Sequence, residues 1–96
     1  MAVARSRRLP WMEFEREADV QREVSNVLPE GSPASMILAF ADEQGLECSG
    51  VENGVVYCSA PALSSIPDAQ AKWLLEMDVA DDRFRRVRVR RGYIAA

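Results

Sequence analysis

The first third of the chain carries apolar residues at the spacing of an α-helix. From residue 11 to residue 28 they recur mostly three and four positions apart, with a drift near the third of them: Trp11, Phe14, Ala18, Val20, Val24, Val27 and Leu28. Pro10 suits the first turn of such a helix because its ring fixes φ near the helical value. The pattern therefore predicts one amphipathic helix over residues 11–28.

A second helix is predicted after the break at Pro29-Glu30-Gly31. Ser32 is expected to be its N-cap, Pro33 its first helical residue and Gly45 its left-handed terminating residue. Between these signals the chain supplies a thick apolar side: Met36, Ile37, Leu38, Phe40 and Ala41. We predict this helix over residues 33–44.

Residues 46–60 predict a β-hairpin that carries both cysteines. With a three-residue loop over residues 52–54, Cys48 faces Cys58 and the apolar side chains share one face: Leu46, Cys48, Val56, Cys58 and Ala60. A two-residue Asn53-Gly54 turn is the stronger turn signal. It would shift the pairing by one and send the cysteines to opposite faces. The apolar pattern favours the three-residue loop, which we predict.

A second hairpin is predicted near the C-terminus. Strands over residues 72–79 and 84–93 both alternate apolar with charged residues, and a three-residue loop over residues 81–83 joins them. This loop pairs Asp78 with Arg86 and Glu76 with Arg88 on an outer face, while Met77 meets Val87 inside. Residues 61–71 form a connection in which Ile66 is expected to turn inward.

The order of these elements predicts an α+β fold. Two N-terminal helices would pack on one face of a four-stranded antiparallel meander sheet. Residues 1–9 are predicted to be a flexible basic tail, and residues 10–96 a single domain of a size that closes one modest core.

A few residues accompany this order of elements. They are Leu28-Pro29-Glu30-Gly31-Ser32-Pro33 before a helix with Ile37 and Phe40, then Gly45, Trp73, and Asp81-Asp82 before an Arg/Val strand. In these features the chain resembles small bacterial domains of the β-lactamase inhibitory protein-like and BamE (SmpA/OmlA)-like fold group. The resemblance implies a bacterial protein-binding module, with no catalytic activity.

Charge is distributed unevenly along the chain. All fifteen acids lie from Glu13 to Asp82 with three bases among them, while the other nine bases are arginines near the two ends. The chain has no histidine, so it lacks the usual general base near neutral pH and the commonest metal ligand. We therefore expect no enzyme activity, catalytic residue, metal, cofactor or small-molecule substrate.

Cys48 and Cys58 are expected to form a disulfide, with two buried thiols as the alternative. Two cysteines without histidine are too few for a zinc site, and a redox pair is usually spaced Cys-x-x-Cys. A bridge would close a loop worth very roughly 2–3 kcal/mol and would require an oxidising compartment.

The outer face of the predicted sheet combines aromatic, apolar and arginine side chains, which is the composition of interface hot spots. Scattered apolar residues are also normal on surfaces, so this composition alone leaves both interpretations open. We predict that a partner protein or a second copy binds here: Tyr57, Leu74, Arg86, Arg88 and Arg90. The alternative is an arginine-rich site for anions or nucleic acid. The acids between the two basic ends disfavour it.

No apolar run approaches the roughly 18 residues of a membrane span. The basic start has no apolar segment typical of a secretory signal. We expect a periplasmic or envelope location if residues 1–96 are a mature fragment, and a cytoplasmic one otherwise.

Overall fold

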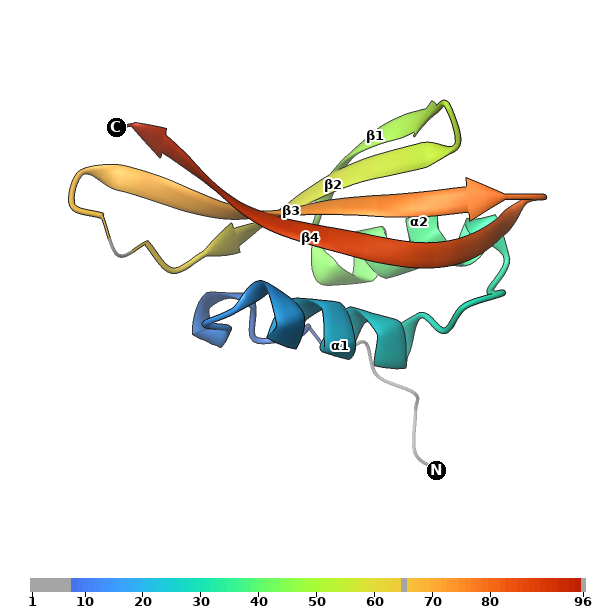
Figure 1. Ribbon diagram of the computed structural model, residues 1–96, viewed down its shortest axis with the longest axis horizontal. Helices are drawn as coiled ribbons and strands as arrows, with labels where there is room; N and C mark the ends of the chain where they lie inside the picture. Colours follow the sequence, from blue (N-terminus) through green and yellow to red (C-terminus); the bar gives the residue numbers. More distant parts are fainter. Residues whose placement is uncertain (1–7, 65, 96) are drawn as a thin grey trace.

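The computed structural model describes residues 8–64 and 66–95, so most of the predicted basic tail, residues 1–7, lies outside the described residues. The elements are η1 (Trp11–Glu13), α1 (Glu17–Val27), α2 (Ala34–Gln44), β1 (Glu47–Glu52), β2 (Val55–Ala62), β3 (Ala69–Ala80) and β4 (Arg83–Ala95). The strands form one antiparallel sheet in the order β1-β2-β3-β4, and both α-helices lie on one face of it (Figure 1). The predicted α+β meander is confirmed.

The first predicted helix is wrong in its extent. A short 3-10 turn, η1, ends at Glu13 and is followed by Phe14, whose ψ of 136° is extended, and α1 begins only at Glu17. Trp11 and Val20 are nine residues apart, about two and a half helical turns, so a continuous helix would place them on opposite sides. The break lets both side chains enter the core, where Trp11 is 5% exposed and Val20 fully buried.

Helix α2 ends as predicted but begins differently. Gly45 adopts the left-handed conformation, with φ 70° and ψ 30°. Pro33 is the N-cap, and the Ser32 hydroxyl donates to the Pro29 carbonyl at 2.6 Å, so the predicted Ser32 cap is wrong. The N–H of Ala34 instead donates to the carbonyl of Asp82 at 2.9 Å. The turn between β3 and β4 therefore satisfies the start of the helix, which a local sequence pattern does not reveal.

The first hairpin turns through two residues, so the predicted three-residue loop is wrong. Asn53 and Gly54 both have positive φ, as a tight Asn-Gly turn requires, and Glu52 pairs with Val55. A bulge between Cys48 and Val51 then shifts the register by one residue. The predicted pairing of Cys48 with Cys58 is thereby confirmed, because the bulge reconciles the best turn with the apolar pattern.

The second hairpin likewise combines a two-residue turn with a one-residue bulge. Asp81 and Asp82 have φ of 53° and 60°, Ala80 pairs with Arg83, and the register shifts between Asp78 and Val79. The predicted loop over residues 81–83 is again wrong. The predicted cross-strand pairs are confirmed: Asp78 with Arg86, Met77 with Val87 and Glu76 with Arg88.

The core lies between the helices and the inner face of the sheet. Along β3 the alternate residues Trp73, Leu75 and Met77 are fully buried, as predicted. The indole N–H of Trp73 donates to the Trp11 carbonyl at 2.9 Å, which joins the sheet to η1. Ile66 is 48% exposed, so its predicted inward position is wrong. It lies in the β2–β3 connection, which projects beyond the helices (Figure 1).

Candidate protein-binding surface on the outer sheet face

The five side chains predicted to form an interface lie together on the sheet face opposite the helices. Three neighbouring rows cross strands β2, β3 and β4 there: Val55–Asp78–Arg86, Tyr57–Glu76–Arg88 and Ser59–Leu74–Arg90. Tyr57 is 46% exposed and Leu74 partly so, whereas their strand neighbours Cys58 and Leu75 face the core. The structure thus brings together Tyr57, Leu74, Arg86, Arg88 and Arg90.

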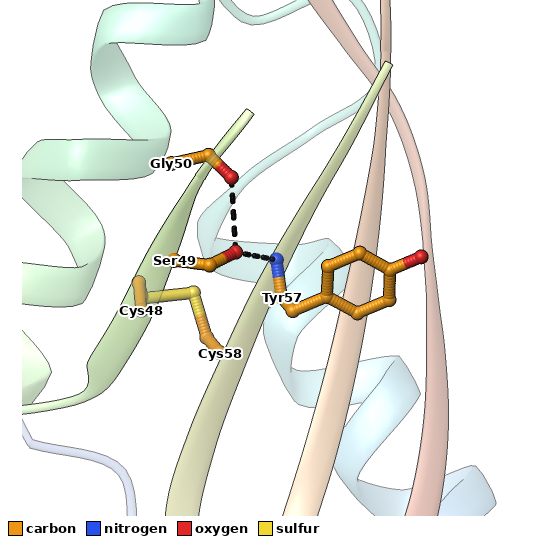
Figure 2. The surroundings of a disulfide bond; sticks show 5 residues. All are labelled: Cys48, Ser49, Gly50, Tyr57 and Cys58. Carbon is orange, nitrogen blue, oxygen red and sulfur yellow. Dashed lines mark hydrogen bonds between the residues drawn. A yellow bond between two sulfur atoms is a disulfide. The ribbon is translucent and has the colours of Figure 1, made fainter. Parts of the chain in front are cut away.

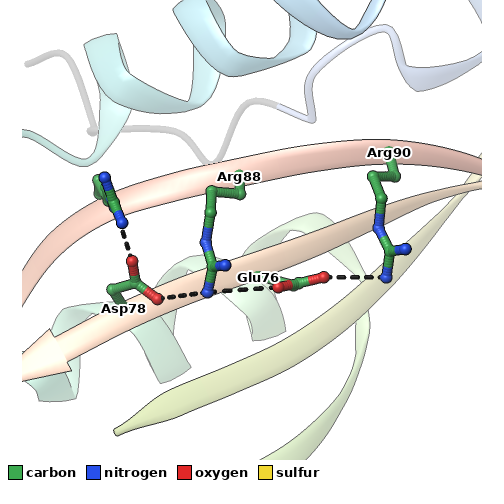
Figure 3. A network of polar contacts seen from close by, with 5 residues as sticks. Glu76, Asp78, Arg88 and Arg90 are labelled. Atoms are coloured by element: carbon green, nitrogen blue, oxygen red, sulfur yellow. Dashed lines mark hydrogen bonds and ion pairs between the residues drawn. The ribbon is translucent and has the colours of Figure 1, made fainter.

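The three arginines alternate with two carboxylates, and we call this set of five residues the ion-pair row. Asp78 accepts hydrogen bonds from Arg86 and Arg88, both at 2.8 Å. Arg88 also lies 3.3 Å from Glu76, which accepts a hydrogen bond from Arg90 at 3.0 Å (Figure 3). Arginine is suited to such contacts because its planar fork presents several donors at once.

The carboxylates of the ion-pair row are less exposed than its arginines. The side chains of Glu76 and Asp78 are 16% and 21% exposed, whereas those of Arg86 and Arg90 are 70% and 72% exposed. The hydrogen bond from Arg86 holds the pKa of Asp78 below its ordinary value, with further lowering by Arg88. The face therefore presents guanidinium groups to solvent, held from beneath by two less exposed carboxylates.

A shallow groove of about 250 Å³ lies beside the ion-pair row, and we call it the outer groove. Its lining comes from β1, β2, β3 and β4: Glu47, Tyr57, Cys58, Ser59, Leu74, Leu75, Glu76 and Arg90. At its rim the carboxylate of Glu47 is 84% exposed and lies 3.7 Å from the amino group of Lys72. The lining thus combines one aromatic residue, two leucines, one arginine and two acids.

A disulfide between Cys48 and Cys58 ties β1 to β2 next to this surface, so the favoured prediction is confirmed over two buried thiols. Within the bulge, the Ser49 hydroxyl accepts a hydrogen bond from the Tyr57 N–H at 3.2 Å and donates to the Gly50 carbonyl at 2.9 Å. The Tyr57 side chain points away from the disulfide (Figure 2). The bulge and the bridge therefore hold the backbone that presents Tyr57.

Some arginines of the basic C-terminal stretch do not belong to this surface. Arg91 lies on the inner face, where its guanidinium carbon is 4.3 Å from the centroid of the Trp73 ring and its Nη2 donates to the Glu15 carbonyl at 2.7 Å. Arg83 donates to the Gly31 carbonyl at 2.9 Å. Because side chains alternate along β4, Arg91 lies on the inner face, although its charge alone would group it with the other C-terminal arginines.

Sequence reasoning missed Glu47, Ser49 and Ser59 as parts of this surface. The signal for Ser49 was present, because the Asn-Gly turn and the apolar pattern demand registers that differ by one residue. A bulge at the small residues Ser49 and Gly50 resolves that conflict. The lining by Glu47 depends on where β1 begins, which the spacing of apolar residues does not define.

The described part of the chain contains no group of three or more His, Cys, Asp or Glu side chains placed to bind a metal ion. Among the same residues, no helix combines the length and the apolar character needed to cross a bilayer. The chain was also compared with models of protein families, with curated proteins and with solved structures, and none of them matches it.

Proposed function

We propose that this chain is a non-enzymatic interaction domain that binds a partner protein through the outer face of its sheet. The observation that carries the proposal is the outer groove, with Tyr57 exposed and Leu74 partly exposed beside a row of oriented arginines. Tyrosine and arginine dominate interface hot spots because they bury a large contact area and form directional hydrogen bonds.

The ion-pair row supports a protein partner more than a polyanion. Glu76 and Asp78 already neutralise much of the positive charge, and a phosphate backbone would have to displace them. They also fix the arginine side chains before binding, which lowers the entropy that a partner has to remove. Anion or nucleic-acid binding by these arginines is therefore the alternative that the test below has to exclude.

The charge of the row favours a different protein over a second copy. Three guanidinium groups face two carboxylates, so the row keeps one excess positive charge. The same face of a second copy would carry the same excess. A partner with an acidic surface next to apolar residues is complementary to it.

The disulfide supports an oxidising compartment such as the periplasm, because such bridges form and persist outside reducing cytosol. Together with the resemblance to the β-lactamase inhibitory protein-like and BamE-like group, it leads us to propose a bacterial envelope protein. The arrangement of two helices and a meander sheet is consistent with that group.

The experiment measures the affinity of a partner, isolated on the immobilised chain, for two outer-face variants and one control. Tyr57→Ser and Arg88→Gln should each weaken binding at least about tenfold, as hot-spot residues do. Met36→Gln, on the helical side and 49% exposed, should leave the affinity unchanged. Thermal melts confirm that each variant is folded.

Equal affinity of all three variants would contradict the proposal. Self-association of the chain that Tyr57→Ser abolishes would identify a second copy as the partner instead. Retention on a polyanion column that falls with salt and with Arg88→Gln would favour the alternative function.

A further inference from the structure

The ion-pair row alternates regularly along β3 and β4 but stops before the alternation is complete. Arg88 lies between two carboxylates, at 2.8 Å from Asp78 and 3.3 Å from Glu76. Arg90 occupies the equivalent place one step further along β4, and contacts Glu76 at 3.0 Å on one side. On its other side the matching position of β3 is Leu74, the cross-strand partner of Arg90.

The outer groove lies at this end of the ion-pair row, where Leu74 stands in place of a carboxylate. Leu74 and Arg90 both line it, and Tyr57 forms part of its wall. The Arg90 side chain is 72% exposed, so much of its guanidinium group is available to a visiting acceptor. The opposite end of the row, at Arg86, does not border the outer groove.

We propose that the outer groove recognises an aspartate or glutamate side chain of the partner, flanked by an apolar residue, an inference that rests on the proposed function. The carboxylate would bind Arg90 and complete the alternation, as Glu76 does for Arg88. The flanking residue would cover Leu74 and Tyr57. The groove, at about 250 Å³, is smaller than the roughly 300–1,000 Å³ of typical small-molecule sites, and suits a side chain better.

Two acids line the outer groove and oppose an incoming carboxylate: Glu76, which is paired with Arg88 and Arg90, and Glu47 at the rim. The Glu47 carboxylate is directed to Lys72, at 3.7 Å, and is 84% exposed, so water screens it strongly. The preference for an acidic partner therefore depends on Arg90, and it should strengthen if Glu47 is replaced by glutamine.

The test uses a capped peptide as a probe, acetyl-Ser-Phe-Glu-Ser-amide, and its counterpart with glutamine in place of glutamate. The native protein should bind the glutamate peptide about fivefold more tightly, the value of a good exposed ion pair, with a shift of the Arg90 Nε–H signal in NMR. Equal binding of the two peptides, or no binding of either, would overturn the proposal.

Leu74→Glu supplies the missing carboxylate from the chain itself, so it should abolish the preference for the glutamate peptide. Leu74→Gln has nearly the same shape without the charge and should keep the preference. If the two variants discriminate between the peptides equally well, Arg90 does not read a carboxylate at this place.

Arg90→Gln and Arg86→Gln form a matched pair, since each removes an arginine of similar exposure that contacts one acid. Only Arg90→Gln should lose the preference for the glutamate peptide. Loss of that preference with Arg86→Gln alone would contradict the assignment of Arg90 as the residue that binds the carboxylate. Tighter binding of a phosphoserine peptide, or of a peptide with a free C-terminal carboxylate, would show that the groove serves another anion.

The outcomes separate this inference from the proposed function. A partner that is sensitive to Tyr57→Ser but equally bound by Leu74→Glu and Leu74→Gln would refute the carboxylate site alone. A partner that is indifferent to Tyr57→Ser would refute docking on the outer face, whatever the peptides show.

Discussion

The two hairpins share one design but are held in the sheet by different means. Each combines a two-residue turn of positive φ with a one-residue bulge, which precedes the turn in the first hairpin and follows it in the second. β1 is six residues long and largely exposed, and a disulfide links it to β2. β4 is thirteen residues long and packs against α1, with the ion-pair row on its outer side. Where burial is small, a covalent bond takes over the role that packing plays elsewhere.

The largest effect is expected in the packed part of the sheet. Trp73 is fully buried on β3, and Trp73→Ala should lower the free energy of unfolding by about 3–5 kcal/mol. Val51 on β1 is 60% exposed, so Val51→Ala should change it by less than about 0.5 kcal/mol. Urea denaturation measures both. Similar costs for the two variants would contradict the contrast between the hairpins.

The second-largest change in stability is expected from removing the disulfide between β1 and β2. Replacing Cys48 and Cys58 together by alanine removes a cross-link between residues ten positions apart, which should cost about 2–3 kcal/mol. The loss should be local, so amide hydrogen exchange should accelerate in β1 and much less in β3 and β4. Equal acceleration across all four strands would show that β1 is not held separately.

Substitutions in the two turns should change the stability by smaller amounts and in opposite directions. Gly54→Ala places a Cβ 3.1 Å from the Val79 carbonyl at a φ of +75°, and should cost about 1–2 kcal/mol. Asp82 has a φ of 60°, so Asp82→Gly should relieve strain and stabilise the chain by up to about 1 kcal/mol. Thermal melts of the two variants should move in opposite directions, and a shared direction would argue against the two-residue turns.

The smallest effect is that of pH on the ion-pair row. The pKa of folded Asp78 lies below its ordinary value of 3.8, chiefly through Arg86. Its stabilising contribution is therefore fully present above pH 3.8 and is lost as pH falls through the lower folded value. Asp78→Asn should remove this dependence, at a cost of at most about 1 kcal/mol because the arginines that pair with Asp78 are exposed. An NMR titration in which Asp78 shows an ordinary or raised pKa would contradict it.

Much of the fold could be predicted because the spacing of apolar residues reports which side of each element is buried. The alternation in β3 and the pairing of Asp78 with Arg86 follow from it directly. The turns could not be settled this way, since a bulge lets a chain satisfy a turn signal and a burial pattern that disagree. The break before Glu17 had a signal, because Trp11 and Val20 fall on opposite sides of a continuous helix.

Five members of the candidate surface were predictable, but Glu47, Ser49, Ser59 and the geometry of the surface were not. Residue types and strand parity placed Tyr57, Leu74 and the three arginines on one face. The interruption of the ion-pair row at Leu74, and the groove beside it, depend on distances between side chains on different strands. Sequence spacing alone contains no such distances.

The most direct test of the outer face as the binding surface follows the protein by NMR while its isolated partner is added. We predict that the Nε–H signals of Arg88 and Arg90 and the amide signals of β2 and β3 around Tyr57 and Leu74 shift, while those of α2 stay in place. Shifts confined to the helices, with the arginine signals unchanged, would contradict the proposed function.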